Sequence, residues 1–99
     1  MKKMATITND QGQTISVSFN LFDLKQLLQI KIGQELSWAQ IARETELHRN
    51  TIERIANNQT HRTDLKTIAK LLLFFHSKGM NVDINELLVV SISEKNQSS

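Results

Sequence analysis

The chain has 99 residues, of which 39% are hydrophobic and 22% charged, and its formal net charge is +2. This length and composition are typical of one globular domain and exclude a second enzyme-sized domain, while the absence of cysteine excludes disulfides, a thiolate nucleophile and a cysteine-ligated zinc ion. The mildly basic balance permits nucleic acid as a partner without requiring it.

The sequence contains no segment suited to crossing a membrane. Its longest apolar run, Leu71–Phe75, is far shorter than the ~20 residues of a transmembrane helix. The residues that follow Met1 lead into polar sequence and not into the apolar core of a secretory signal. We therefore expect a single domain over residues 1–99, in the cytoplasm and without a membrane partner.

A β-hairpin is predicted over residues 4–19. Apolar residues alternate with serines over Thr14–Phe19, and this period of two is typical of a half-buried strand. Met4–Thr8 also favours a strand, and Asn9–Gly12 between the two is turn sequence. The residues expected on the buried side are Ile15, Val17 and Phe19.

Five helices are predicted over residues 20–88, where apolar residues recur at helical spacing. Their expected first residues or caps are Asn20, Ser37, His48, Asp64 (or Thr63) and Asp83. The third of these helices extends over His48–Asn57. Residues 89–93 alternate again and predict a possible last strand, and residues 94–99 form a polar tail that we expect to be frayed.

The fourth predicted helix is more apolar than one buried face requires. The residues expected in the core are Leu65, Ile68, Ala69, Leu72 and Phe75. Leu71 and Phe74 would then face away from the core. We expect these two side chains to form a subunit interface or to cover the β segment.

The second and third predicted helices are joined by about three residues, and their apolar positions have a distinctive layout. Ala42 is small, and the larger Leu47, Ile52 and Ile55 follow it. A helix that crosses another near a right angle needs a small residue at the closest approach and larger ones beside it. This layout is typical of a helix-turn-helix, which presents the start of its second helix to the major groove of DNA.

The segment Leu36–Ile55 resembles the helix-turn-helix of the phage-repressor family, the Cro and lambda-repressor-like proteins. The most specific parts are Ile-Ala-Arg-x-Thr-x-Leu and Arg-Asn-Thr-Ile-x-Arg-Ile, and residues 64–70 and 83–88 resemble the fourth and fifth helices of that family. The resemblance implies a mainly α, five-helix DNA-binding domain, here flanked by the hairpin and the possible strand. It also implies a sequence-specific transcriptional regulator, most simply a homodimeric repressor that inserts residues 48–57 into the major groove of double-stranded DNA.

Four positions depart from the family pattern. Trp38 stands where the family usually has Gln, and Thr63 where it often has Pro. Asn58 stands in place of a frequent Gly. Glu46 replaces the usual Gly of the turn, where a left-handed backbone would cost on the order of 1 kcal/mol, so either the turn differs in shape or the strain is accepted.

Two sets of residues are candidates for DNA contact. The resemblance assigns base contacts to Arg49, Asn50, Arg54 and His48, because Arg pairs with guanine and Asn with adenine. It assigns phosphate contacts to Ser37, Trp38, Thr51, Asn57, Asn58, His61 and Arg62. Glu53 is expected to orient Arg54 or to accept a hydrogen bond from cytosine. Taken outside this motif, each of these residues could belong to an ordinary solvated surface.

The sequence does not favour an enzyme, a metal site or a cofactor site. The three histidines lack the spacing of metal ligands on one helix, and the three glycines form no phosphate-binding loop. The alternative function is a protein-interaction module, most plausibly an antitoxin that binds a toxin with its strands or with Leu71 and Phe74. A weaker alternative is a helix-turn-helix that serves only as a scaffold.

Overall fold

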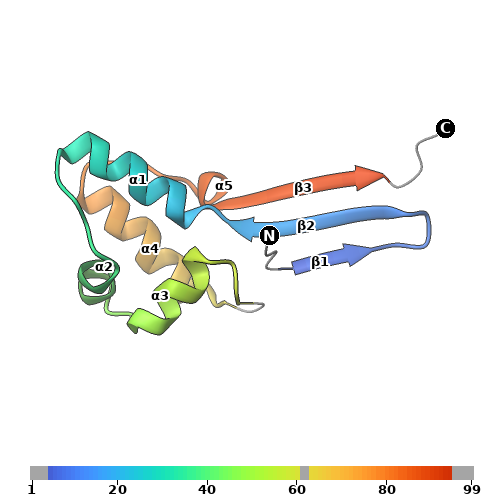
Figure 1. Ribbon diagram of the computed structural model, residues 1–99, viewed down its shortest axis with the longest axis horizontal. Coiled ribbons are helices and arrows are strands. Elements are labelled where there is room, and N and C mark those ends of the chain that lie inside the picture. Colours follow the sequence, from blue (N-terminus) through green and yellow to red (C-terminus); the bar gives the residue numbers. More distant parts are fainter. Residues whose placement is uncertain (1–4, 61–62, 95–99) are drawn as a thin grey trace.

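The computed structural model describes residues 5–60 and 63–94 (Figure 1). In this part of the chain, five helices form one body, and three strands form a sheet that projects from it, so the molecule is elongated, 49 by 24 by 21 Å. The elements are β1 (Ala5–Thr8), β2 (Gln13–Phe19), α1 (Leu21–Ile32), α2 (Trp38–Thr45), α3 (Arg49–Ala56), α4 (Leu65–Ser77), α5 (Ile84–Leu87) and β3 (Leu88–Glu94).

The prediction of a mainly α fold is wrong, because the strands form a full three-stranded antiparallel sheet in the order β1-β2-β3. The hairpin of β1 and β2 lies where the sequence predicted it. The difference comes from β3, which pairs with β2 along its whole length, from Phe19 opposite Leu88 to Gln13 opposite Glu94. Glu94, expected in a frayed tail, therefore belongs to a strand, and residues 95–99 lie outside the described residues.

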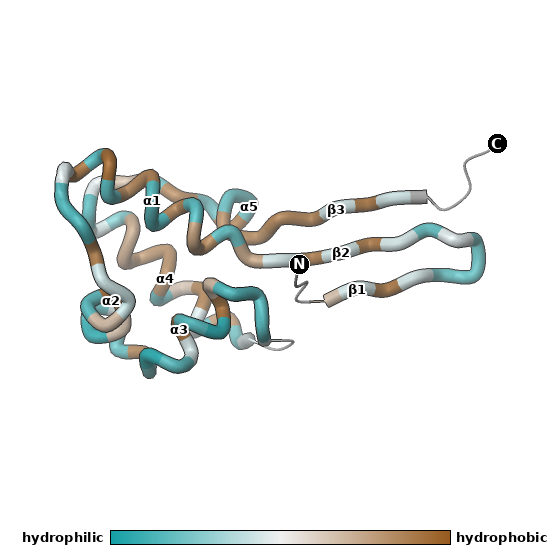
Figure 2. Tube along the Cα trace, in the orientation of Figure 1, coloured by the Kyte–Doolittle hydropathy of each residue, from teal (hydrophilic) through white to brown (hydrophobic). Residues whose placement is uncertain are grey.

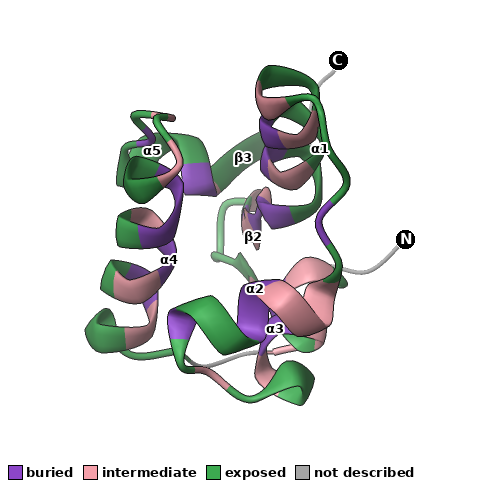
Figure 3. Ribbon diagram, turned by 90° about the vertical axis from the view of Figure 1, so that its left-hand side faces the viewer, coloured by how far each residue is buried: buried purple, intermediate pink, exposed green. Residues whose placement is uncertain are grey.

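The helical body is closed by apolar side chains that face its centre. The buried residues of α1 and α4 face each other across the body, and those of α2 and α3 close it from one side (Figure 3). The expected core face of α4 is confirmed at Ile68 and Phe75, which are buried. It is wrong elsewhere, because Leu71 and Phe74 are buried and Leu65 is 79% exposed. In the described part of the chain, no helix combines the length and the apolar character that crossing a membrane requires.

The helix starts follow the capping residues expected from the sequence. The Ser37 hydroxyl accepts a hydrogen bond from the Gln40 N–H, and the Asp64 carboxylate accepts one from Thr67. Asp83 and Glu86 form a reciprocal capping box at α5. Asn20 precedes α1, but its side chain makes no capping hydrogen bond there.

The sheet has one apolar face and one hydroxyl-rich face, because directly paired residues of antiparallel strands point to the same side. The apolar face consists of Ala5, Ile7, Ile15, Val17, Phe19, Leu88, Val90 and Ile92, and the polar pair of Gln13 and Glu94 follows on the same side at the tip. The other face consists of Thr6, Thr8, Thr14, Ser16, Ser18, Val89, Ser91 and Ser93. The apolar face is covered only at its base, where Phe19 is buried. The expectation that Ile15 would be buried is therefore wrong, since it is 42% exposed.

The base of the sheet is joined to the helical body by hydrogen bonds from two asparagines. The Phe19 N–H donates to the Asn58 side-chain oxygen at 2.6 Å, and the Asn58 amide nitrogen donates to the Phe19 carbonyl at 3.2 Å. The Asn20 N–H donates to the Leu87 carbonyl at 2.7 Å. These bonds attach the end of β2 both to the loop after α3 and to α5.

We predict that Asn58→Gly lowers the free energy of unfolding by about 1–3 kcal/mol, because it removes two partly buried hydrogen bonds to Phe19. Glycine adopts the left-handed backbone of this position, where φ is 55°, without strain, and asparagine also tolerates it well, so relief of strain offsets little of this loss. Urea unfolding followed by circular dichroism measures the effect. The neighbouring Asn57→Gly is the matched control, and an equal loss in both variants would contradict the proposed role of the Asn58 amide.

Candidate nucleic-acid interface

The helix-turn-helix predicted from the sequence is formed by α2 and α3. The two helices pack through Ile41 and Ala42 of α2 and through Ile52 and Ile55 of α3, which are all buried. The buried Thr45 hydroxyl donates to the Ile41 carbonyl at 2.8 Å and is thereby satisfied within its own helix. Because Ile52 and Ile55 are the buried residues of α3, this helix is held by one face, and its other face points to solvent.

The turn between the two helices has the left-handed backbone at Glu46 that the sequence analysis considered, so the strain is present. Glu46 adopts a left-handed conformation with φ 60° and ψ 35°, and its N–H caps α2 by donating to the carbonyls of Ala42 and Arg43. The next N–H, from Leu47, also bonds to the Ala42 carbonyl at 3.0 Å. The turn therefore keeps the shape that a glycine would favour, with a glutamate in its place.

We predict that Glu46→Gly stabilises the fold by about 0.5–1 kcal/mol, which is the relieved left-handed strain less the entropy that glycine loses on folding. The midpoint of thermal unfolding should rise by about 2–8 °C. Asn57→Gly serves as a control because Asn57 has an ordinary φ of −95°. A gain in both variants would mean that strain at Glu46 is not the cause.

The exposed start of α3 gathers five of the candidate DNA-contacting residues. An open depression on this surface is lined by His48, Arg49, Asn50, Thr51 and Arg54. The lower end of α3 in Figure 2 is correspondingly hydrophilic. His48 begins the helix without a side-chain capping bond, so its imidazole is not occupied by the helix start. All four residues expected to contact bases thus lie on one surface.

Arg49 is held by an ion pair within α3. Its Nε donates to a carboxylate oxygen of Glu53 at 2.8 Å, and the two side chains are 63% and 38% exposed. Glu53 was expected to orient Arg54. It pairs instead with Arg49, four residues earlier on the same face of α3. The two terminal nitrogens of the Arg49 guanidinium remain as further donors.

The residues expected to contact phosphates, apart from Trp38, fall into three groups. Ser37 and Asn57 are exposed, and Thr51 is half-buried. Asn58 is engaged with the Phe19 peptide group, so we assign it to the fold and leave it out of the contact set. His61 and Arg62 lie outside the described residues.

Trp38 is packed and not freely exposed. The Lys25 ammonium lies 4.8 Å from the centroid of the Trp38 ring, and the Phe22 ring centroid lies 6.2 Å from it. Lys25 thus places a cation beside the start of α2, which the sequence analysis missed. No local signal could have revealed this contact, because it joins residues of two different helices.

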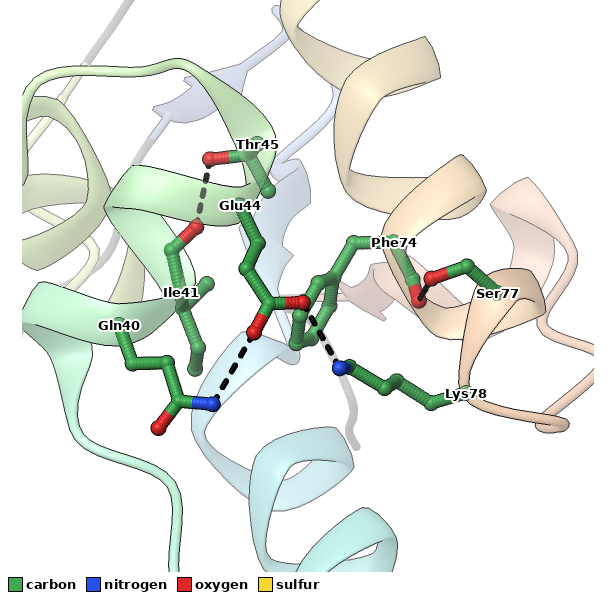
Figure 4. A network of polar contacts seen from close by, with 7 residues as sticks. All are labelled: Gln40, Ile41, Glu44, Thr45, Phe74, Ser77 and Lys78. Carbon is green, nitrogen blue, oxygen red and sulfur yellow. Dashed lines mark hydrogen bonds and ion pairs between the residues drawn. The ribbon is translucent and has the colours of Figure 1, made fainter.

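A polar contact holds α2 against the end of α4 (Figure 4). The Lys78 ammonium lies 2.7 Å from one oxygen of Glu44, and the Gln40 amide donates to the other at 3.0 Å. The hydrogen bond from Lys78, with that from Gln40, holds the pKa of Glu44 below its ordinary value. The contact thereby helps to fix the helix that supports α3.

The lowered pKa makes this contact sensitive to acid. Because the Glu44 pKa is lower in the folded than in the unfolded protein, its contribution is present above the unfolded value and is lost as the pH falls through the folded value. A double-mutant cycle with Glu44→Gln and Lys78→Met should give a coupling of about 0.2–1 kcal/mol near neutral pH. The coupling should fall as the pH drops below the ordinary pKa of a glutamate and through the lowered pKa of Glu44, because the carboxylate then becomes protonated. A coupling independent of pH would contradict the ion pair.

Comparisons with known proteins add no further constraint, since no family model, curated protein or solved structure matches this chain. Within residues 5–60 and 63–94, no group of three or more His, Cys, Asp or Glu side chains is arranged to hold a metal ion. The site is therefore defined by the exposed start of α3 and by the polar residues around the start of α2.

Proposed function

We propose that the protein binds double-stranded DNA at specific sequences, with the start of α3 in the major groove, and acts as a transcriptional regulator. The observation that carries the proposal is the exposed surface at the start of α3, where Arg49, Asn50 and Arg54 lie together. Arg and Asn are the residue types best suited to guanine and adenine edges. The resemblance of Leu36–Ile55 to phage repressors supports the same function.

The Arg49–Glu53 ion pair suits Arg49 to base recognition. It occupies Nε and leaves the terminal nitrogens available for the two acceptors of a guanine. It also pairs the acidic group on this surface with a cation, which reduces the repulsion that Glu53 would otherwise exert on phosphates. Asn50 and Arg54 flank Arg49 on the same surface and can contact neighbouring base pairs.

The start of α2 is the proposed phosphate-binding region. The Ser37 hydroxyl accepts a hydrogen bond from Gln40, so its own proton is available to a phosphate oxygen. The free N–H groups of the first turn of α2 favour an anion. Lys25, held over Trp38, adds a positive charge nearby. Such contacts fix the position of the protein on the duplex without selecting a sequence.

In this proposal the protein regulates by occupancy. A bound protein covers the DNA that polymerase needs, which favours repression, and the cytoplasm is the expected location. The alternative is a module that binds a partner protein, as an antitoxin does. The observation that favours this alternative is the exposed apolar face of the sheet, together with the outer edges of β1 and β3, which pair with no other described strand.

Selection of binding sites from random duplex DNA at near-physiological salt tests the proposal. We expect an enriched two-fold symmetric motif, and Arg49→Ala should weaken binding to it by about 1–3 kcal/mol and relax the preference at one base pair. Lys31→Ala is the matched control, since it removes one exposed positive charge at the far end of α1.

Three results would count against this assignment. Failure to enrich any motif would contradict sequence-specific binding. An equal loss for Arg49→Ala on every sequence would move Arg49 from the base contacts to the phosphate contacts. Equal effects of Arg49→Ala and Lys31→Ala would show that only net charge matters.

A further inference from the structure

The apolar face of the sheet is a continuation of the core onto an exposed surface. It begins at the buried Phe19 and the half-buried Leu88 opposite it, where the sheet joins the helical body. Toward the tip its residues become exposed, with Ile92 at 66% and Ile7 at 72%. A shallow groove crosses the face between Ile7, Ile15 and Ile92, one from each strand, and Asn9 and Gln13 also line it. Contiguous apolar surface of this kind marks an interaction site in a water-soluble protein.

We propose that this face is the interface between two copies of the chain. The choice of a second copy as the partner rests on the DNA-binding function proposed above. This face would bring two α3 helices together on one DNA duplex. The eight apolar residues of the face carry no charge, and the register places the Gln13 and Glu94 pair beyond them at the tip of the sheet, so the same surface on a second copy buries no charge away from that tip. A two-fold dimer needs such a self-complementary patch.

The position of α3 relative to the sheet favours a second copy over another partner. In Figure 1, α3 lies beyond the β1 side of the sheet, while β3 forms the opposite edge. When two sheets pack face to face about an axis that runs across the strands, both α3 helices stay on the same side of the dimer. Pairing at the strand edges about an axis perpendicular to the sheet would instead send the two helices in opposite directions.

The upper bound on the separation of the two α3 helices is compatible with DNA. Asn58, next to the end of α3, is bonded to Phe19 at the base of β2. Half the length of a seven-residue strand is about 12 Å, and half the length of an eight-residue helix is about 6 Å. Each α3 therefore centres within about 20 Å of the middle of the sheet, which places the pair within about 40 Å. One turn of B-DNA separates half-sites by about 34–36 Å.

The size of the face predicts a weak dimer. Seven residues in each of two strands and four in the third cover roughly 300 Å² per copy in flat projection. Two copies together cover roughly 600 Å² in flat projection, which is below the about 1,000 Å² in total that stable specific interfaces bury. We therefore expect a micromolar dissociation constant in the absence of DNA.

Sedimentation velocity of the full chain without DNA, over roughly 1–300 µM, tests the interface. The wild type should dimerise, and Ile92→Glu should weaken the dimer about tenfold or more, because each dimer would bury two unpaired carboxylates. Ser93→Glu, which adds the same charge to the opposite face, is the matched control. A monomeric wild type, or equal effects of the two variants, would overturn the inference.

Chemical cross-linking keeps the test decisive if Ile92→Glu does not fold. The chain has no cysteine, so Ile15→Cys introduces a single thiol on the apolar face and Ser93→Cys one on the other. Packed sheets lie about 10 Å apart, so a bismaleimide of that length should link Ile15→Cys into dimers and leave Ser93→Cys monomeric. Equal yields would overturn the interface.

The two proposals can fail separately. A dimer that depends on Ile92 but enriches no DNA motif would retain the interface and reject DNA recognition. A monomer that selects a single asymmetric half-site would retain DNA recognition and reject the interface. A wild type that stays monomeric in every buffer would assign the apolar face to a different protein.

Discussion

The pair of hydrogen bonds between the Asn58 amide and the Phe19 peptide group determines how the sheet is placed relative to α3. The projecting sheet touches the helical body only at its base, so its direction depends on few contacts. Asn58 lies just after α3, and Phe19 is the last residue of β2. One side chain therefore links the surface proposed for DNA to the surface proposed for dimerisation, in addition to the Asn20–Leu87 hydrogen bond that attaches the sheet to α5.

This junction explains why two neighbouring asparagines have different roles. Asn57 is exposed, whereas Asn58 turns its amide inward and takes a left-handed backbone that asparagine tolerates well. Glu46, the other described non-glycine residue with positive φ, makes no comparable contact. The left-handed backbone at Asn58 comes with hydrogen bonds to Phe19 of β2, whereas the left-handed backbone at Glu46 only shapes the turn after α2.

Local signals in the sequence predicted the local structure well. Ser37 and Asp64 cap the helices expected of them, and Asn9–Gly12 forms the hairpin turn. The exposed group of Arg49, Asn50 and Arg54 also follows from helical spacing alone. These features depend on residues within one or two turns of each other, where chain geometry determines which side chains meet.

The features that the sequence did not predict are contacts between distant elements. Alternation indicates that residues 89–93 form a strand, but not that β2 is its partner, so the class of fold was misjudged. Leu71 and Phe74 are buried because α4 packs against neighbours on more than one side. By contrast, the pairing of Glu53 with Arg49 has a local signal in its i, i+4 spacing, which the analysis of single residues overlooked.

The order of the strands along the chain has a consequence for folding kinetics. All five helices lie between β2 and β3, so pairing Phe19 with Leu88 closes the longest loop in the fold, and such non-local pairing is slow. The β1–β2 hairpin, with its short turn, can form in microseconds and then exposes an open β2 edge. During refolding at high concentration, β3 of one chain can complete the sheet of another, producing strand-exchanged dimers whose yield depends on the concentration at which folding began.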